Sequence, residues 1–425
     1  MTARPLMHDN LTTIAVVATI VSLLLLIVVL VITSVMRRVW NLRKYRKLDT
    51  LRQKYRQRMQ VVLKERDLAK HVETFSSKPG SAAWQAVEEI LLDLTNDEMI
   101  SVEAKTLLQK IGYVSYYENK LTSRKELTRA FAIDKLGRMG SPSSTRKLIP
   151  LLNESNPEIL TVTVRALSRI GSKEGLLAII ERLPVLLGKT LVTRKAMGTA
   201  LLNFGDDAIP YLVTYEAEQN DPWIMSCVLE TLSHLTPDPR AQLLAIEHLG
   251  SQNAEVRSKA LKVLAQVDQP SPTHLPELIA PLLDDQVWFV RLQAIKSARE
   301  LGCETMARPI GKLLFDKNWY VRSEAALALT QLGACAVDVF LDALKTEDTY
   351  AKESVCEEIE RSQFIDWLIA HLDREDETMR TKSREILKIM HSLNFSSQLM
   401  EYLTRDGNER IKEQVRELLT EDRVR

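Results

Sequence analysis

Residues 321–333 read VRSEAALALTQLG, and residues 290–302 read VRLQAIKSARELG. Each stretch begins with a Val-Arg pair, continues with apolar residues at helical spacing and ends in Leu-Gly. A third copy, VRSKALKVLAQV, begins at Val256, and looser copies extend the series in both directions. The copies in the middle of the chain begin at positions 159, 193, 224, 256, 290 and 321. This regular spacing predicts a stacked array of helical repeats.

A shorter amphipathic segment precedes each of the best copies. Examples are LIPLLNES at 148–155, ELIAPLLDD at 277–285 and PIGKLLFDK at 309–317. Each finishes at or close to an Asp, Asn or Ser, residues that suit a turn and the N-cap of the following helix. The repeating unit is therefore a pair of helices, and stacked neighbours are needed to bury its apolar face. We expect an all-α chain with about ten such repeats over residues 82–425.

The repeat pattern L-L-x-D-x-x-x-x-V-R-x-x-A-x-x-A-L-x-x-L-G resembles HEAT repeats, in the short bacterial form that also occurs in phycobilisome lyases. The resemblance is strong in residues 240–335 and degenerate from 345 onward, where the Leu-Gly ending is lost. Looser copies begin at Ile100, Met379 and Ile411. The resemblance implies an α-solenoid. Members of the family are mostly binding scaffolds and a few are enzymes, so the fold by itself does not give the function.

The arginine of each Val-Arg pair has two interpretations. The three side chains can line a ligand groove. Alternatively, the family resemblance implies a structural ladder, in which each arginine pairs with a turn aspartate of its own or an adjacent repeat. Recurrence in every good repeat favours the ladder, because a site needs no such regularity. The arginines are Arg257, Arg291 and Arg322, and the candidate partners are Asp284, Asp285 and Asp316.

Aromatic residues gather at the turn that precedes the second helix of several repeats. Stacked repeats place these turns along one edge of the array, where aromatic side chains make good anchors for a protein partner. The alternative is that each aromatic ring only packs on its own turn. The candidate protein-binding residues are Trp223, Trp288, Phe289, Trp319 and Tyr320.

Ahead of the repeats, residues 14–32 read IAVVATIVSLLLLIVVLVI, with only Thr19 and Ser22 as polar members. A bilayer core about 30 Å thick requires about 20 apolar residues in a helix. We therefore predict a transmembrane helix over residues 13–36. A buried soluble helix is the first alternative, but this segment is apolar on every face. A cleaved signal peptide is the second, but the run is long and no small-x-small cleavage site follows it.

Charged flanks predict the orientation of this helix. Only Arg4, His8 and Asp9 carry titratable side chains before it, and short flanks rich in Lys and Arg stay in the cytoplasm. Residues 1–12 should lie outside the cell membrane (the inner membrane, where there are two), with the remainder cytoplasmic. Four cysteines without paired spacing agree with a reducing compartment. The basic residues that follow, which are candidates for binding anionic lipid, are Arg37, Arg38, Arg43, Lys44, Arg46 and Lys47.

These basic residues open a predicted helix over residues 37–75, which a linker at 76–81 separates from the repeats. The formal charge is +10 over residues 37–66 and −9 from residue 67 to the end, within a total of +1. A narrow apolar stripe runs along the helix. It can lie on anionic headgroups, pair with another helix (a second copy or a partner), or form a solvated spacer. The stripe consists of Leu48, Leu51, Tyr55, Met59 and Val62.

Catalytic motifs are absent from the sequence. The seven histidines are scattered, and no HExxH, Walker loop, GxSxG or Cys/His cluster occurs. The sequence therefore predicts no catalytic residue, cofactor or metal, and the acidic body argues against nucleic acid. The favoured function is a non-catalytic scaffold that positions protein partners at the membrane, an integral membrane enzyme or transporter among them. The alternative is a lyase- or chaperone-like protein with a ligand site on the concave face.

Overall fold

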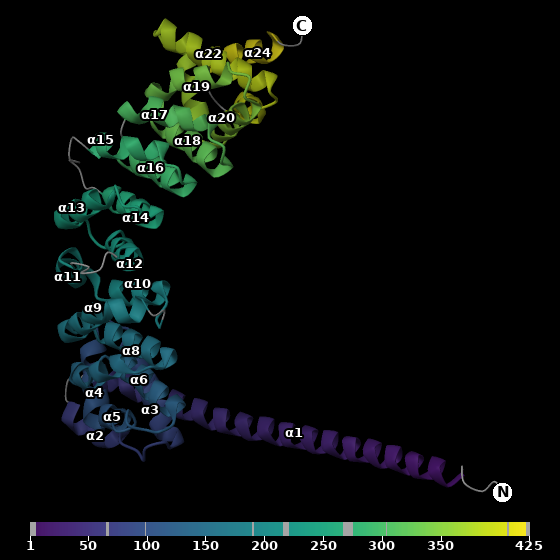
Figure 1. Cartoon of the computed structure of the whole chain (residues 1–425), viewed down its shortest axis with the longest axis vertical. Helices are drawn as coiled ribbons and strands as arrows, with labels where there is room; N and C mark the ends of the chain where they lie inside the picture. Colours follow the sequence, from purple (N-terminus) through teal and green to yellow (C-terminus); the bar gives the residue numbers. More distant parts are fainter. Residues whose placement is uncertain are drawn as a thin grey trace. The chain divides into compact units, whose positions relative to one another are not determined.

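The computed structural model of the chain is all-α, with 24 α-helices among the residues that it describes (Figure 1). These residues are 6–64, 68–97, 99–188, 191–215, 221–266, 275–302, 304–405 and 408–421. The first five residues of the predicted outer segment, and Cys303, lie outside them. The chain divides into two compact units, Met1–Gly175 and Leu176–Arg425.

The first unit begins with a helix far longer than the others. Its elements are α1 (Leu6–Lys64), α2 (Leu68–Phe75), α3 (Ala82–Leu94), α4 (Ser101–Ile111), α5 (Tyr113–Glu118), α6 (Glu126–Met139), η1 (Pro142–Ser144), α7 (Thr145–Leu148), η2 (Ile149–Asn153) and α8 (Pro157–Ile170). Helix α1 has 59 residues. The predicted membrane segment and most of the predicted basic helix therefore form one continuous element.

The two halves of α1 have opposite surroundings. Apolar side chains of the N-terminal half, such as Leu25, are exposed to the outside of the unit, and Figure 1 shows this half projecting away from the other helices. The C-terminal half packs along α3, where Leu48 and Met59 are 2% and 0% exposed. The ring of Tyr55 lies 6.0 Å from that of Phe75 on α2. Leu48, Tyr55 and Met59 of the apolar stripe thus contact helices of their own chain, a partner that was not among the three sequence interpretations. The side chain of Val62 lies outside the described residues.

A buried ion pair joins α3 to the repeats. The Lys135 Nζ lies 3.1 Å from the Glu88 Oε1, and both side chains are at least nine-tenths buried. Beyond it, α6 packs closely on α8, because a Cβ on Gly137 would lie 2.5 Å from the Cα of Ala166. Helices α3, α6 and α8 are therefore held together by close backbone contact and by a buried charge pair.

Helix α6 corrects the sequence interpretation of this region. The copy that begins at Ile100 forms α4, which packs on α2, α3 and α5. The helix that stacks on α8 is α6, and its Thr128-Arg129 pair holds the place of Val-Arg. This repeat was missed because a threonine replaces the valine and Met-Gly replaces the Leu-Gly ending.

The second unit continues the repeats. Its helices are α9 (Lys173–Gly188, which spans the boundary), α10 (Arg194–Leu202), α11 (Ile209–Val213), α12 (Pro222–Leu232), α13 (Pro239–His248), α14 (Ala254–Leu264), α15 (Leu275–Ile279), α16 (Trp288–Glu300), α17 (Ala307–Lys312), α18 (Trp319–Gln331), α19 (Val337–Leu344), α20 (Thr349–Arg361), α21 (Phe364–Ala370), α22 (Glu377–Ser392), α23 (Ser397–Thr404) and α24 (Glu409–Glu421). Short 3-10 turns join many of them: η3 (Gly205–Ala208), η4 (Ala280–Asp284), η5 (Glu304–Met306), η6 (Leu313–Phe315), η7 (Gly333–Ala336) and η8 (His371–Asp373).

Second helices of successive repeats form one layer of this unit. Helices α10, α12, α14, α16, α18 and α20 each pack on the next. Asn253 and Asn318 cap two of them by accepting hydrogen bonds from backbone amides. The Leu-Gly endings place Gly302 and Gly333 at φ +60° and +63°, the left-handed conformation in which glycine ends a helix.

Stacking changes near the C-terminus, where the sequence pattern degenerates. Helix α22 packs on α19 as well as on α21. Lys382 and Lys345 form ion pairs with Asp338 and Glu385 across the α19–α22 contact. A connection of only two residues, Ser362 and Gln363, separates α20 from α21, in place of the Leu-Gly turn and 3-10 segment of the regular repeats.

The packing of α1 on α3 predicts that Leu48 contributes to the stability of the first unit. Replacing Leu48 by Ala removes a buried side chain and should lower the free energy of unfolding of the first unit by about 2–5 kcal/mol. Limited proteolysis should then cut more readily at the basic residues of α1 that follow Leu48. The control is Tyr45→Ala, because Tyr45 is 56% exposed and its loss should change stability little. Equal protection of both variants would contradict the packing.

Candidate functional site

Arginines of the Val-Arg pairs bridge consecutive repeats. The Arg257 Nε and Nη2 donate hydrogen bonds to the two Asp285 carboxylate oxygens, at 2.7 and 2.9 Å. Arg291 donates to Asp316 in the same way, at 2.7 and 2.8 Å. Each guanidinium also donates to the turn before its own helix, as Arg291 Nη1 does to the Asp285 carbonyl oxygen at 2.7 Å. Each of these arginines therefore links its own turn to the turn of the next repeat through hydrogen bonds.

Of the adjacent candidates Asp284 and Asp285, the structure brings only Asp285 to an arginine. Asp284 lies at the end of η4 and is exposed. In the first unit, Arg129 and Glu154 form a pair of the same kind, with 3.2 Å between Nη1 and Oε1. Sequence reasoning did not find this pair because a glutamate takes the place of the aspartate.

The ladder ends at Arg322. Its Nη1 donates to the Asp316 carbonyl oxygen at 2.9 Å, as in the preceding repeats. In the next turn, however, Thr346 stands where an aspartate is required. The guanidinium carbon instead lies 5.3 Å from the centroid of the Tyr350 ring, a cation–π contact. The change of partner couples the end of the ladder to an exposed aromatic side chain.

Aromatic side chains from three repeats lie beside this point. The rings of Trp288 and Tyr320 are stacked across the α16–α18 contact, with centroids 5.9 Å apart and planes at 24°. Trp319 lies edge-on to Tyr320 at 4.8 Å, and Phe289 edge-on to Trp288 at 5.9 Å. Together with Tyr350 these residues form the aromatic cluster. Its exposed members are Trp288, Trp319, Tyr320 and Tyr350, between 40% and 66% exposed.

Trp223 stands apart from the aromatic cluster. The repeat between it and Trp288 has Ala254 and Glu255 at the corresponding turn, which interrupts the row. The Trp223 ring instead lies under the Arg194 guanidinium, whose carbon is 4.3 Å from the ring centroid. Tyr350, by contrast, belongs to the cluster but was not among the sequence candidates, because its helix begins Thr-Tyr and lacks the tryptophan.

Basic residues of α1 divide into two groups. Arg52 donates to Glu89 and Asp49, and Arg56 lies 3.7 Å from Asp93, so these two basic residues face α3. The N-terminal group is exposed and forms no ion pair within the described part of the chain. Its described side chains are Arg37, Arg38, Arg43, Arg46 and Lys47, and the side chain of Lys44 lies outside the described residues.

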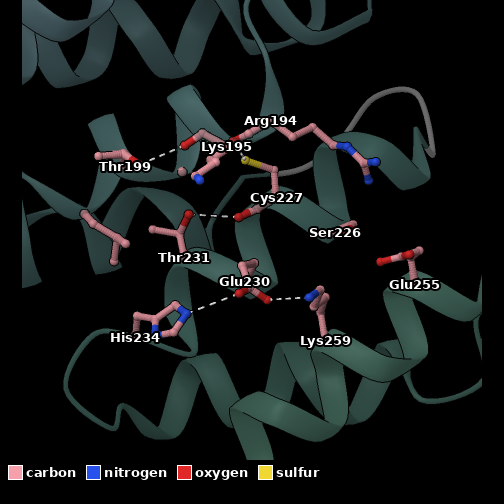
Figure 2. Close-up of a pocket in the computed structure, with 12 residues that line it drawn as sticks. Arg194, Lys195, Thr199, Ser226, Cys227, Glu230, Thr231, His234, Glu255 and Lys259 are labelled. Carbon is pink, nitrogen blue, oxygen red and sulfur yellow. Dashed lines mark hydrogen bonds and ion pairs between the residues drawn. The ribbon is translucent and has the colours of Figure 1, made fainter. Parts of the chain in front are cut away.

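A cavity of about 640 Å³ opens along the layer of second helices, lined by α10, α12 and α14 (Figure 2). Glu230 lies near its centre. One carboxylate oxygen is 2.7 Å from the Lys259 Nζ, and the other is 2.9 Å from the Lys262 Nζ. Burial by itself would raise the pKa of Glu230, but hydrogen bonds from the two lysines outweigh it and hold the pKa at about 2. This carboxylate is therefore ionised at neutral pH.

Cys227 lines the same cavity but is a weak nucleophile. Burial raises the pKa of its thiol to about 11, so the reactive thiolate is scarce near neutral pH. The neighbouring Thr231 hydroxyl donates to the Cys227 carbonyl oxygen at 2.8 Å. Among the described residues, no group of three or more His, Cys, Asp or Glu side chains is arranged to hold a metal ion.

Comparison with known proteins identifies the repeats. Residues 275–360, which contain the complete aromatic cluster, match the family model for HEAT repeats. The chain contains HEAT repeats. A search of curated protein sequences gave no match. Among solved structures, the chain is similar to a crystal structure of an engineered protein at 18% identity and a TM-score of 0.36, over 76% of this chain and 99% of the other.

The Arg291–Asp316 pair should contribute strongly to the stability of the HEAT repeats. Its side chains are 15% and 6% exposed, and removal of one partner leaves a buried charge without its partner. Asp316→Ala should therefore lower the free energy of unfolding, measured in urea, by about 3 kcal/mol. Asp284→Ala is the matched control and should change it by less than about 0.5 kcal/mol. Equal effects would contradict the ladder.

The same pair predicts a loss of stability in acid. Burial by itself would raise the pKa of Asp316, but hydrogen bonds from Arg291 and the Asn318 amide lower it below its ordinary value. Because the pKa of Asp316 is lower in the folded state, its carboxylate stabilises the fold fully above the unfolded-state pKa of about 3.9. This stabilisation is lost as the pH falls through the folded-state pKa. Urea midpoints between about pH 5 and pH 2 should fall less steeply in Asp316→Ala than in the unmodified chain.

Proposed function

We propose that the chain is a membrane-anchored, non-catalytic scaffold. In this proposal the apolar half of α1 crosses the membrane, the N-terminus faces outward and the HEAT repeats lie in the cytoplasm. The aromatic cluster binds a protein partner, such as an integral membrane enzyme or transporter. Anchoring both proteins in one membrane raises their effective concentration and strengthens a weak contact by a factor on the order of 10².

The membrane anchor is supported by composition and by exposure. The most apolar window of α1 has a mean hydropathy of 2.9, and none of it is buried in the unit. The amphipathic rings of Trp40 and Tyr45 follow the apolar run and are 69% and 56% exposed, as in the aromatic belts at membrane interfaces. Arg37, Arg38 and Arg43 lie in the same stretch and suit the cytoplasmic side and its anionic lipids.

A cleaved signal sequence passes the same length and hydropathy test. Continuity of α1 supports the anchor instead. The helix runs from the apolar segment to Leu48 and Met59, which are buried against the first unit. A retained segment leaves this helix whole, whereas cleavage after the apolar run would create a new terminus within it. We therefore propose that the segment stays in the mature protein.

Partner binding is supported by the aromatic cluster. Trp and Tyr are enriched among the residues that contribute most to protein interfaces, because they bury a large area at low entropic cost. Trp319 and Tyr350 are 54% and 66% exposed. The stack of Trp288 on Tyr320 fixes two rings before a partner arrives, which lowers the entropic cost of binding.

A second candidate function rests on the cavity around Glu230. Its volume of about 640 Å³ falls in the range of small-molecule sites, and its lining combines charged, hydroxyl and apolar groups. A lyase- or chaperone-like activity on a small ligand would use this cavity and would not need the aromatic cluster.

Affinity capture from detergent-solubilised membranes tests the scaffold proposal. The full chain should retain a protein partner, and Trp288→Ala with Trp319→Ala should lower the recovered amount at least tenfold, because Trp is enriched among the interface hot spots, whose truncation costs about 2 kcal/mol or more. Trp223→Ala is the matched control, since it has the same residue type at an equivalent turn but lies outside the aromatic cluster. Retention of a small molecule with no protein partner would favour the cavity.

Thiol labelling of intact cells tests the orientation. A cysteine introduced at Ala3 should react with a membrane-impermeant maleimide, whereas the exposed Cys335 should react only after lysis. The intact mass of the membrane-extracted protein should include residues 1–36. Labelling of Cys335 on intact cells would reverse the orientation, and loss of the first residues from the mature protein would identify a signal sequence.

A further inference from the structure

Helices α1, α3 and α6 run in the same direction through the first unit, and four contacts give their register. Arg52 and Arg56 of α1 pair with Glu89 and Asp93 of α3, one turn apart on both helices. Glu88 of α3 pairs with Lys135 of α6, and Thr95, beyond the C-terminal end of α3, hydrogen-bonds to the carbonyl oxygen of Arg138 near the C-terminal end of α6. The N-terminal ends of α3 and α6 therefore point toward the apolar half of α1.

This register gives the position of the N-terminal end of α6 along the axis of α1, which is called its height below. Glu88, one residue before Glu89, corresponds to residue 51 of α1, and Lys135 lies beside it. Counting back eight residues from Lys135 puts Leu127 level with residue 43 of α1. At about 1.5 Å per residue, Leu127 lies about 10 Å beyond Met36, where the apolar segment ends. The polar headgroup layer occupies about 5–8 Å beyond the hydrocarbon core, so the backbone at Leu127 lies about 2–5 Å outside this layer, close enough for the leucine side chain to reach its outer part.

The side chains at this end of α6 suit an anionic membrane surface. Residues 119–131 contain four basic residues and one acidic residue, Glu126. Arg124 and Lys125 are exposed and form no ion pair in the described part of the chain. Leu127 and Phe131 follow, four residues apart on one face of the helix, and are 84% and 53% exposed. Exposed apolar side chains beside basic ones are typical of helix ends that bind membrane interfaces.

We propose that the N-terminal end of α6 is a second membrane contact, in which Arg124 and Lys125 bind anionic headgroups and Leu127 enters the interface. This inference rests on the proposed anchor, because only a membrane-spanning α1 brings the surface to this height. Helices pack 8–10 Å apart, so α6, the second helix from α1, contacts the bilayer about 20 Å to the side of the anchor. Two separated contacts fix the tilt of α1 and the direction in which the first unit faces.

Site-directed spin labelling in lipid nanodiscs tests the contact on the full chain. Cys303 and Cys335 are replaced by Ser, and a nitroxide is attached to Leu127→Cys. The matched control is Met99→Cys, because Met99 is 87% exposed but follows the C-terminal end of α3, at the opposite end of the unit. Accessibility to a water-soluble nickel reagent is compared between nanodiscs that contain anionic phosphatidylserine and nanodiscs of phosphatidylcholine alone.

In the anionic nanodiscs, nickel accessibility at position 127 should be at least threefold lower than at position 99. Arg124→Gln with Lys125→Gln should remove most of this protection while the chain stays inserted. Equal accessibility at the two positions in an inserted chain would overturn the second contact and leave the anchor intact. A chain that does not co-purify with nanodiscs at all would instead refute the anchor itself.

Discussion

Burial of Leu48 and Met59 of α1 against the first helical unit is the constraint on which the rest of the structure depends. A membrane helix followed by a flexible linker would leave the repeats free to take any direction. Here the apolar segment and the packed segment are one helix, and the ion pairs of Arg52 and Arg56 with α3 fix its register. The position of the apolar segment thereby determines the position of the first repeats.

Within the second unit, the arginine ladder and the aromatic cluster are two outcomes of one repeat pattern. Where the next turn supplies an aspartate, as for Arg257 and Arg291, the guanidinium is paired and largely buried. At Arg322 the aspartate is replaced, and the guanidinium lies against the ring of Tyr350. The candidate binding surface therefore lies where the regular pairing ends, close to the aromatic rings of α16 and α18.

Sequence alone predicted much of the fold, because periodic apolar residues and Leu-Gly endings report helix length and helix termination directly. It missed the repeat formed by α6, since Thr128-Arg129 preserves only the arginine of the pair. Proximity was harder to predict. No pattern indicated that the apolar stripe of α1 packs on α3, because the same stripe suits a lipid surface or a second helix equally well.

For the candidate sites as well, the sequence predicted the repeated positions but not which side chains lie close together. The turn positions of Trp288 and Trp319 were evident from the sequence, as was the recurrence of the arginines. The choice of Asp285 over Asp284 depends on one residue of turn geometry, which periodicity does not determine. The cavity around Glu230 joins residues from three repeats, and its lysines had no distinguishing spacing, so only the packed structure reveals it.

Pulsed electron paramagnetic resonance tests most directly whether α1 and the first unit form one rigid body. Nitroxides are placed at Leu42→Cys, on the exposed part of α1, and at Lys110→Cys, on α4, in a chain whose Cys303 and Cys335 are replaced by Ser. In lipid nanodiscs, a rigid body should give a single narrow distance distribution that is unchanged by lipid composition. A broad distribution, or one that shifts with the lipid, would show that α1 moves independently of the repeats and would refute the rigid packing of α1 on the first unit.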